Sequence, residues 1–132
     1  MNALEFRFAF YARDFEKSVS FYRDMLGMKY IGGWDRPDDK GALLSAGGTG
    51  VVEIFGEPAG KTYKGPNPTA VNLALRLEDI SAVDHFYEDL LQKGAEHVRA
   101  PKGSSWGHYA LRIDDPDDIP IYVYCEVAEP LT

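Results

Sequence analysis

The chain has 132 residues, of which 45% are hydrophobic and 27% are charged, a balance that predicts one folded domain and excludes wholesale disorder. Its 14 basic and 21 acidic residues give a net charge of −7, which disfavours nucleic acids and anionic membranes as partners and would favour a cationic small molecule. The single cysteine, Cys125, excludes an internal disulfide, and no apolar run approaches the roughly 20 residues that span a bilayer. The amino terminus does not resemble a signal peptide, so we expect a cytoplasmic protein.

An internal repeat organises the sequence. Residues 7–27 align with residues 72–92, so that Asp14 falls on Asp79 and the pair Phe21-Tyr22 falls on Phe86-Tyr87. A stretch rich in proline and glycine separates the two copies and is typical of a linker. We therefore expect a single domain over residues 1–132, with module one at 1–56, a linker at 57–69 and module two at 70–132.

Module one begins with a predicted strand over residues 6–11, in which three phenylalanines alternate with Arg7, Ala9 and Tyr11. A helix follows, with Asp14 as its N-cap and Gly27 at its end. Three more strands are predicted over residues 28–34, 41–46 and 50–55, with a glycine hairpin between the last two.

Module two repeats this order. A strand alternates three leucines with Asn72, Ala74 and Arg76, and the helix after it has Asp79 or Ser81 as its N-cap. Its remaining strands are predicted over residues 95–100, 108–113 and 119–127. Each module is therefore predicted to be βαβββ.

Two segments carry a resemblance to a known family, RDFEKSVSFYRDMLGMKY near the start and WGHYALRIDDPDDIPIYVYCEV near the end. With the repeated βαβββ unit, they resemble the vicinal oxygen chelate superfamily, which includes glyoxalase I, bleomycin-resistance proteins, extradiol dioxygenases and methylmalonyl-CoA epimerase. The resemblance implies an α+β fold in which two βαβββ modules form curled mixed sheets around a cleft. It also implies paired modules, within one chain or across a homodimer, with the phenylalanines and leucines under the helices.

Metal-using members of the superfamily place ligands on the first and last strands of each module. The resemblance puts those positions at Arg7, Glu53, Asn72 and Tyr122, of which Glu53 alone is an ordinary ligand for a divalent ion. Arginine is always protonated and has no acceptor, so an Arg7–Glu53 ion pair is expected in place of the metal. We therefore expect no cofactor. The alternative is a divalent metal anchored by Glu53, with the other positions misassigned.

In a shifted register, the three histidines are alternative metal ligands. His85 lies on a helix, and His97 sits in a predicted strand where it could face either way. His108 follows Trp106-Gly107 and is the histidine expected near the cleft. Cys125 should face the core, and Asp118 stands where the family often has a glycine, which indicates an altered hairpin.

The strand alternation and the resemblance together give a candidate ligand-binding cleft, with Arg112 as a further candidate. Its residues are Arg7, Tyr11, Glu53, Asn72, Arg76, Trp106, His108, Tyr122 and Tyr124. Glu53 is also a weak candidate for a general base, although an adjacent arginine would weaken that role. Alternatively, the Arg7–Glu53 pair could hold a ligand carboxylate or simply fill the site.

These observations favour a homodimer that binds a small organic molecule without a metal, and whether it is an enzyme stays open. The alternative is a metal-dependent glyoxalase-like lyase or isomerase. A third interpretation is a protein without enzymatic activity whose cleft is closed by side chains.

Overall fold

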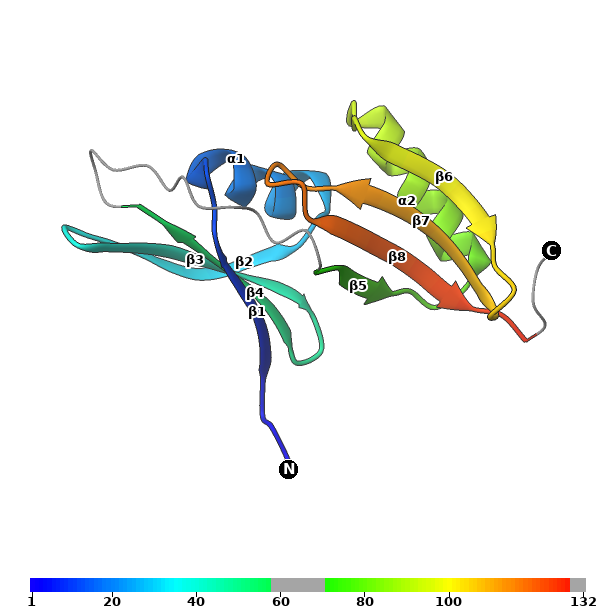
Figure 1. Ribbon diagram of the computed structural model, residues 1–132, viewed down its shortest axis with the longest axis horizontal. Helices are drawn as coiled ribbons and strands as arrows, with labels where there is room; N and C mark the ends of the chain where they lie inside the picture. The colour runs from blue at the N-terminus through cyan, green and yellow to red at the C-terminus, as the bar shows by residue number, and fades with distance from the viewer. Residues whose placement is uncertain (58–70, 129–132) are drawn as a thin grey trace. The chain divides into compact units, whose positions relative to one another are not determined.

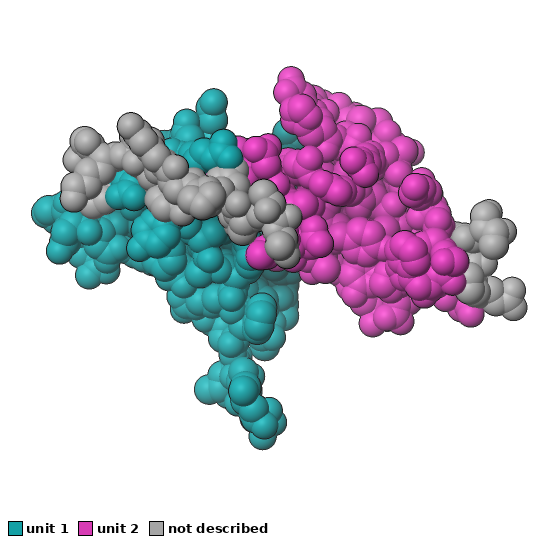
Figure 2. Space-filling view, in the orientation of Figure 1, with its two compact units in different colours: residues 1–67 teal, residues 68–132 magenta. Residues whose placement is uncertain are grey.

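The computed structural model describes residues 1–57 and 71–128, and the chain divides into two compact units, residues 1–67 and 68–132 (Figures 1 and 2). Apart from Glu57, the linker predicted at 57–69 lies outside the described residues. Among the helices of the described part, none has the length and apolar character needed to cross a bilayer.

The first unit is a four-stranded mixed sheet with one helical segment (Figure 1). Its elements are β1 (Phe6–Tyr11), α1 (Phe15–Ser20), a π-helical turn η1 (Phe21–Met25), β2 (Lys29–Arg36), β3 (Asp39–Gly47) and β4 (Gly50–Gly56). The strand order is β1-β4-β3-β2, with β1 parallel to β4 and the other pairs antiparallel. Its core includes Phe10, Tyr22, Leu44 and Ile54, all buried.

The second unit repeats this arrangement. Its elements are β5 (Leu73–Arg76), α2 (Ile80–Gln92), β6 (Val98–Gly103), β7 (His108–Asp114) and β8 (Pro120–Glu126). The order β5-β8-β7-β6 matches that of the first sheet element by element. Residues with no exposure, among them Val83, Leu90, Ile121 and Val123, fill the space between α2 and the sheet. The predicted α+β fold of two βαβββ modules is confirmed.

The predicted helix boundaries follow from capping chemistry. Asp14 accepts a hydrogen bond from the backbone N–H of Lys17 at 3.1 Å, and Asp79 accepts one from Ala82 at 2.8 Å, so Asp79 rather than Ser81 is the second N-cap. Gly27 and Gly94 have φ values of +78° and +79°, the left-handed conformation that ends a helix.

Some sequence predictions were wrong in detail. Phe6 is 74% exposed rather than packed under the helix, because it pairs with Gly50 at the far end of β1 from α1. His97 does not belong to a strand: its φ of +55° breaks the extended backbone, so β6 begins at Val98 and not at residue 95. The strand predicted over residues 28–34 extends to Arg36, so Trp34 lies within β2.

The turn between β7 and β8 depends on one buried carboxylate. Oδ1 of Asp115 accepts hydrogen bonds from the backbone N–H groups of Asp117 and Ile119, both at 2.8 Å. Asp118 then adopts φ +62°, a conformation that glycine takes without steric cost. The sequence indicated an altered hairpin because it has no glycine here. In the structure Asp118 itself adopts the left-handed conformation that glycine favours.

A second polar contact joins the helix to the sheet. The hydroxyl of Tyr109 on β7 donates to Oδ1 of Asp84 on α2 at 2.6 Å. This hydrogen bond, followed by burial, raises the pKa of Tyr109 from 10.0 to about 12. Tyr109 also lies beside Cys125, which is fully buried as predicted, and burial raises the pKa of the Cys125 thiol.

Replacing Tyr109 with phenylalanine should lower the free energy of unfolding by about 1 kcal/mol near neutral pH, since the bond to Asp84 is lost. Because folding raises the pKa of Tyr109, the stabilisation is fully present below about pH 10 and is lost as the pH rises through about 12. Urea unfolding of the wild type, Tyr109→Phe and the exposed control Tyr30→Phe between pH 8 and 12 measures the difference. A gap between wild type and Tyr109→Phe that does not narrow with rising pH would contradict this assignment.

Candidate ligand pocket on the second sheet

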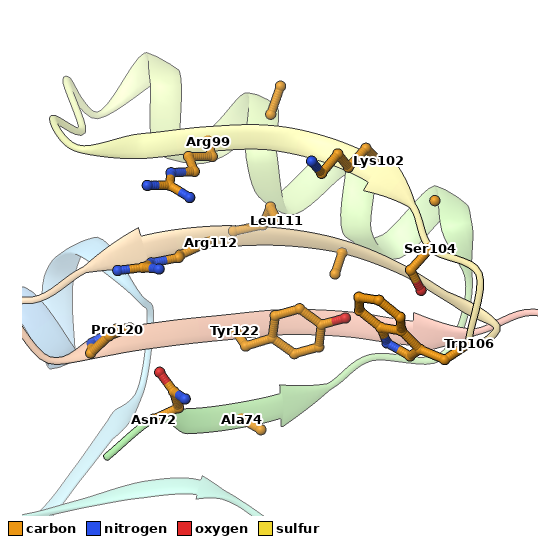
Figure 3. A pocket seen from close by; sticks show the side chains of 13 residues that line it. Asn72, Ala74, Arg99, Lys102, Ser104, Trp106, Leu111, Arg112, Pro120 and Tyr122 are labelled. Carbon is orange, nitrogen blue, oxygen red and sulfur yellow. The ribbon is translucent and has the colours of Figure 1, made fainter. Parts of the chain in front are cut away.

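A cavity of about 590 Å³ lies on the second sheet, on the face opposite α2, which we call the pocket face (Figure 3). This volume is in the range of known small-molecule sites, about 300–1,000 Å³. The lining residues come from all four strands and the β6–β7 turn. They are Asn72, Ala74, Arg99, Ala100, Lys102, Gly103, Ser104, Trp106, Ala110, Leu111, Arg112, Pro120 and Tyr122.

Strand alternation explains why polar and aromatic side chains gather there. Tyr122 on β8 pairs with Ala74 on one side and with Arg112 on the other, and paired residues share a face. Their neighbours along the strand, including Ile121 and Val123, point to the opposite face and are fully buried. The aliphatic residues therefore pack against α2, and the polar and aromatic residues lie on the pocket face.

A cluster of aromatic side chains lies at one end of the pocket face. Nδ1 of His108 is 3.2 Å from Nε1 of Trp106 and 3.2 Å from the hydroxyl of Tyr122. The ring of Tyr124 lies 4.4 Å from the His108 ring and 5.3 Å from the Tyr122 ring. Indole Nε1 only donates, so Nδ1 of His108 accepts and its proton is on Nε2. The Tyr122 hydroxyl lies at the same distance from Nδ1, whose single lone pair already accepts from the indole.

Trp106 itself is 69% exposed in the turn between β6 and β7. Its bond to His108 sets the direction of the indole ring without burying it. A large aromatic surface therefore stands at the pocket, available for contact with a ligand.

Cationic side chains also line the pocket, and of these only Arg112 was predicted from the sequence. Arg99 on β6 is the direct partner of Arg112 on β7, and Lys102 is the partner of Ala110. Arg99 and Lys102 are three residues apart, so simple alternation would put them on opposite faces. One extra residue between them forms a bulge that returns both to the pocket face. Pro101, which lacks an N–H group, lies in that bulge and is the signal that could have located it.

The first unit holds the other predicted residues. Nη1 of Arg7 lies 3.4 Å from Oε1 of Glu53, and Nε of Arg7 also pairs with Glu5. Glu5 and then Glu53 raise the pKa of the Arg7 guanidinium. The expected Arg7–Glu53 ion pair is present, but the Arg7 side chain is 40% exposed, so the pair is not a buried one.

Tyr11 belongs to an aromatic row across the same sheet. Its ring stacks on Phe55 at 4.9 Å, and Trp34 meets Phe55 edge-on at 6.3 Å. Gly41 lies under the indole: a Cβ there would come within 2.2 Å of the Trp34 ring. The absence of a side chain at Gly41 therefore lets Trp34 reach Phe55 across β3.

The remaining candidates lie outside the pocket lining. Arg76 pairs with Glu126 at 3.4 Å, and Tyr124 lies behind His108 and Tyr122. His85 and His97 are exposed, on α2 and before β6. The structure thus brings Trp106, His108, Tyr122 and Tyr124 together in the second unit and Arg7 and Glu53 together in the first.

The four positions that the resemblance assigns to a metal do not fit a divalent ion here. Glu53 is already paired with a guanidinium, and Asn72 and Tyr122 offer neutral oxygens of low affinity. Over residues 1–57 and 71–128, no three His, Cys, Asp or Glu side chains are grouped as a metal site would need.

Comparison with known proteins identifies the family. The family model of the Glyoxalase/Bleomycin resistance protein/Dioxygenase superfamily matches residues 6–123. The chain belongs to this superfamily. A relative from Bacillus subtilis (strain 168), described as the uncharacterized protein YraH, is 32% identical over 120 residues, covering 84% of this chain and 89% of YraH.

Solved structures of other proteins share the fold. TnmS3, an antibiotic binding protein from Streptomyces sp. CB03234, superposes with a TM-score of 0.71 at 20% identity, covering 96% of this chain and 97% of TnmS3. A lactoylglutathione lyase from Agrobacterium tumefaciens superposes at 0.66 and 20% identity, covering 95% and 94%. One of these proteins binds and the other catalyses, so the shared fold does not decide the activity.

A substitution at Gly41 tests the packing of Trp34 in the first unit. Gly41→Ala should lower the free energy of unfolding by about 1–3 kcal/mol, because the new methyl group displaces the Trp34 indole. Gly32→Ala on the neighbouring strand is the matched control, since a Cβ there meets nothing within 4 Å. Chemical denaturation of both variants provides the comparison, and equal effects at the two positions would contradict the packing described.

Proposed function

We propose that this superfamily member binds a small organic molecule in the pocket of the second unit and does so with its own side chains, without a bound metal. The observation that carries the proposal is the pocket itself. A cavity of about 590 Å³ is lined by Tyr122, an exposed Trp106 and several polar side chains, an arrangement suited to an organic ligand.

The aromatic cluster supports binding by stacking. Trp106 donates to Nδ1 of His108 and the Tyr122 hydroxyl lies 3.2 Å from the same nitrogen, and these contacts orient the two rings before a ligand arrives. Rings held in place in advance lose little entropy when a planar ligand packs on them. Aromatic contacts of this kind contribute about 0.5–1.5 kcal/mol beyond the area they bury.

Catalysis has weaker support. Glu53 was the candidate general base, and its carboxylate is engaged by Arg7 at 3.4 Å. Tyr122 and His108 could exchange a proton, but His108 is not among the residues that line the cavity. We therefore favour binding over turnover.

The proposal includes a homodimer located in the cytoplasm. The homodimer is inferred from the paired modules of the superfamily, and the location from the unpaired, buried thiol of Cys125. The net charge of −7 argues against nucleic acids and anionic membranes as partners. Light scattering coupled to size-exclusion chromatography tests the dimer.

A ligand panel tests the binding site. Neutral, cationic and anionic aromatic compounds should include at least one that raises the melting temperature of chelator-treated protein, with an affinity measurable by calorimetry. Tyr122→Ala should weaken that affinity by about tenfold, since a stacked aromatic contact is lost. Tyr30→Ala removes an exposed tyrosine from the first unit and should leave the affinity unchanged. If no compound of the panel binds, the interpretation of a pocket closed to ligands gains support.

Metal content tests the second half of the proposal. After reconstitution with zinc, nickel, manganese or iron, elemental analysis should find no stoichiometric metal in the wild type. An Arg7→His variant should bind more metal, because imidazole beside Glu53 replaces a repelling cation with a donor. One metal per chain in the wild type would instead support the metal-dependent lyase or isomerase, with Glu53 as anchor.

A further inference from the structure

Three cations line the pocket of a protein that is strongly acidic as a whole. Arg99, Lys102 and Arg112 all line the cavity, and no aspartate or glutamate does. Nε of Arg112 forms an ion pair with Oδ1 of Asp114 on the same strand, at 3.2 Å. Within the described residues, the side chains of Arg99 and Lys102 make no ion pair or hydrogen bond.

The arrangement of these charges is unfavourable for folding alone. Arg99 and Arg112 are direct partners across an antiparallel pair and share a face, and like charges at such positions repel (Figure 3). The bulge in β6 adds Lys102 to the same face, although regular pairing would have sent it to the other side. A sheet selected for stability alone would not collect three cations here. An anion bound between them would convert the repulsion into attraction.

The aromatic side chains indicate which shape the rest of the ligand should have. In Figure 3, Tyr122 and Trp106 lie along one part of the cavity, while Arg99 and Arg112 lie toward the other. A ligand that satisfies both parts has a flat apolar body and an anionic group at one end. Paired guanidinium groups suit a carboxylate in particular, because each presents a planar fork of donors that matches its two oxygens.

We propose that the ligand of this pocket is a planar aromatic carboxylate, with its carboxylate between Arg99 and Arg112 and its ring on Tyr122 and Trp106. This inference rests on the proposed function and specifies its ligand class. It runs against the net charge of the chain, which by itself favours a cationic ligand. Lys102 serves the carboxylate as a third, longer-range positive charge.

Three probes with the same ring system and similar size test the charge: 2-naphthoate, 2-naphthamide and 2-naphthylmethylammonium. Calorimetry on chelator-treated protein at low ionic strength should find 2-naphthoate bound at least about tenfold more tightly than the amide, with the ammonium compound weakest. The preference should shrink as salt is added. Arg99→Gln should remove most of the advantage of the carboxylate. Arg36→Gln makes the same charge change on an exposed site of the first unit and should preserve it.

A thermal measurement separates a functional charge from a structural one. If Arg99 serves an anion, Arg99→Gln should raise the melting temperature of the ligand-free protein by about 1–4 °C while it weakens naphthoate binding, since repulsion with Arg112 is relieved. Arg36→Gln loses an exposed ion pair with Asp39 and should not raise it. A loss of stability in Arg99→Gln would mean that Arg99 is structural and would overturn the proposal.

The outcomes distinguish this inference from the function on which it rests. Equal binding of naphthoate and naphthamide, both weakened by Tyr122→Ala, would overturn the carboxylate preference and leave the binding pocket intact. Tightest binding of the ammonium compound would have the same meaning. Failure of all three probes together with the wider aromatic panel would overturn the binding function itself.

Discussion

One helix can cover only one face of a four-stranded sheet, and both units of this chain depend on that limit. In the second unit, α2 takes the side with Ile121, Val123 and Cys125, all fully buried. The alternate residues of β7 and β8 lie on the other face, which α2 does not cover, and they include tyrosine, arginine, histidine and alanine. The division between a sealed aliphatic face and an open polar and aromatic face creates the pocket, because the open face holds side chains that tolerate water and can also bind a ligand.

Much of this could be predicted from the sequence because the relevant signals are local. The period of two along β8 placed Tyr122 and Tyr124 together, and Asp14 and Asp79 marked the helix starts through backbone hydrogen bonds within three residues. The signals that failed are those that break a period. The left-handed conformation of His97 shortens β6, and the bulge after Arg99 reverses the facing of Lys102. A bulge shifts the alternation of side chains by one residue. The sequence pattern therefore did not place both Arg99 and Lys102 on the pocket face. Whether any of the nine cleft residues binds a ligand stays a prediction.

The net charge of the chain does not predict the charge of its pocket. The total of −7 describes the average surface, whereas recognition depends on the few groups within a Debye length of about 10 Å of the ligand. Cations gathered on one sheet face can therefore dominate the potential felt inside the cavity even in an acidic protein. The first unit shows the same local effect, because Arg7 places a positive charge beside Glu53, where a metal ion would otherwise supply it.

The bulge in β6 has an evolutionary consequence. Because one extra residue decides which face Lys102 occupies, loss or gain of a single codon near Pro101 would change the charge of the pocket without any substitution in its lining. α2 also packs on β7 and β8, and the pairing of those strands with each other and with β5 does not involve the bulge, so that part of the unit would keep its packing. Relatives with the same architecture could therefore diverge in their ligands through short insertions and deletions at a sheet edge. Their differences would escape any comparison that aligns residues strictly one to one.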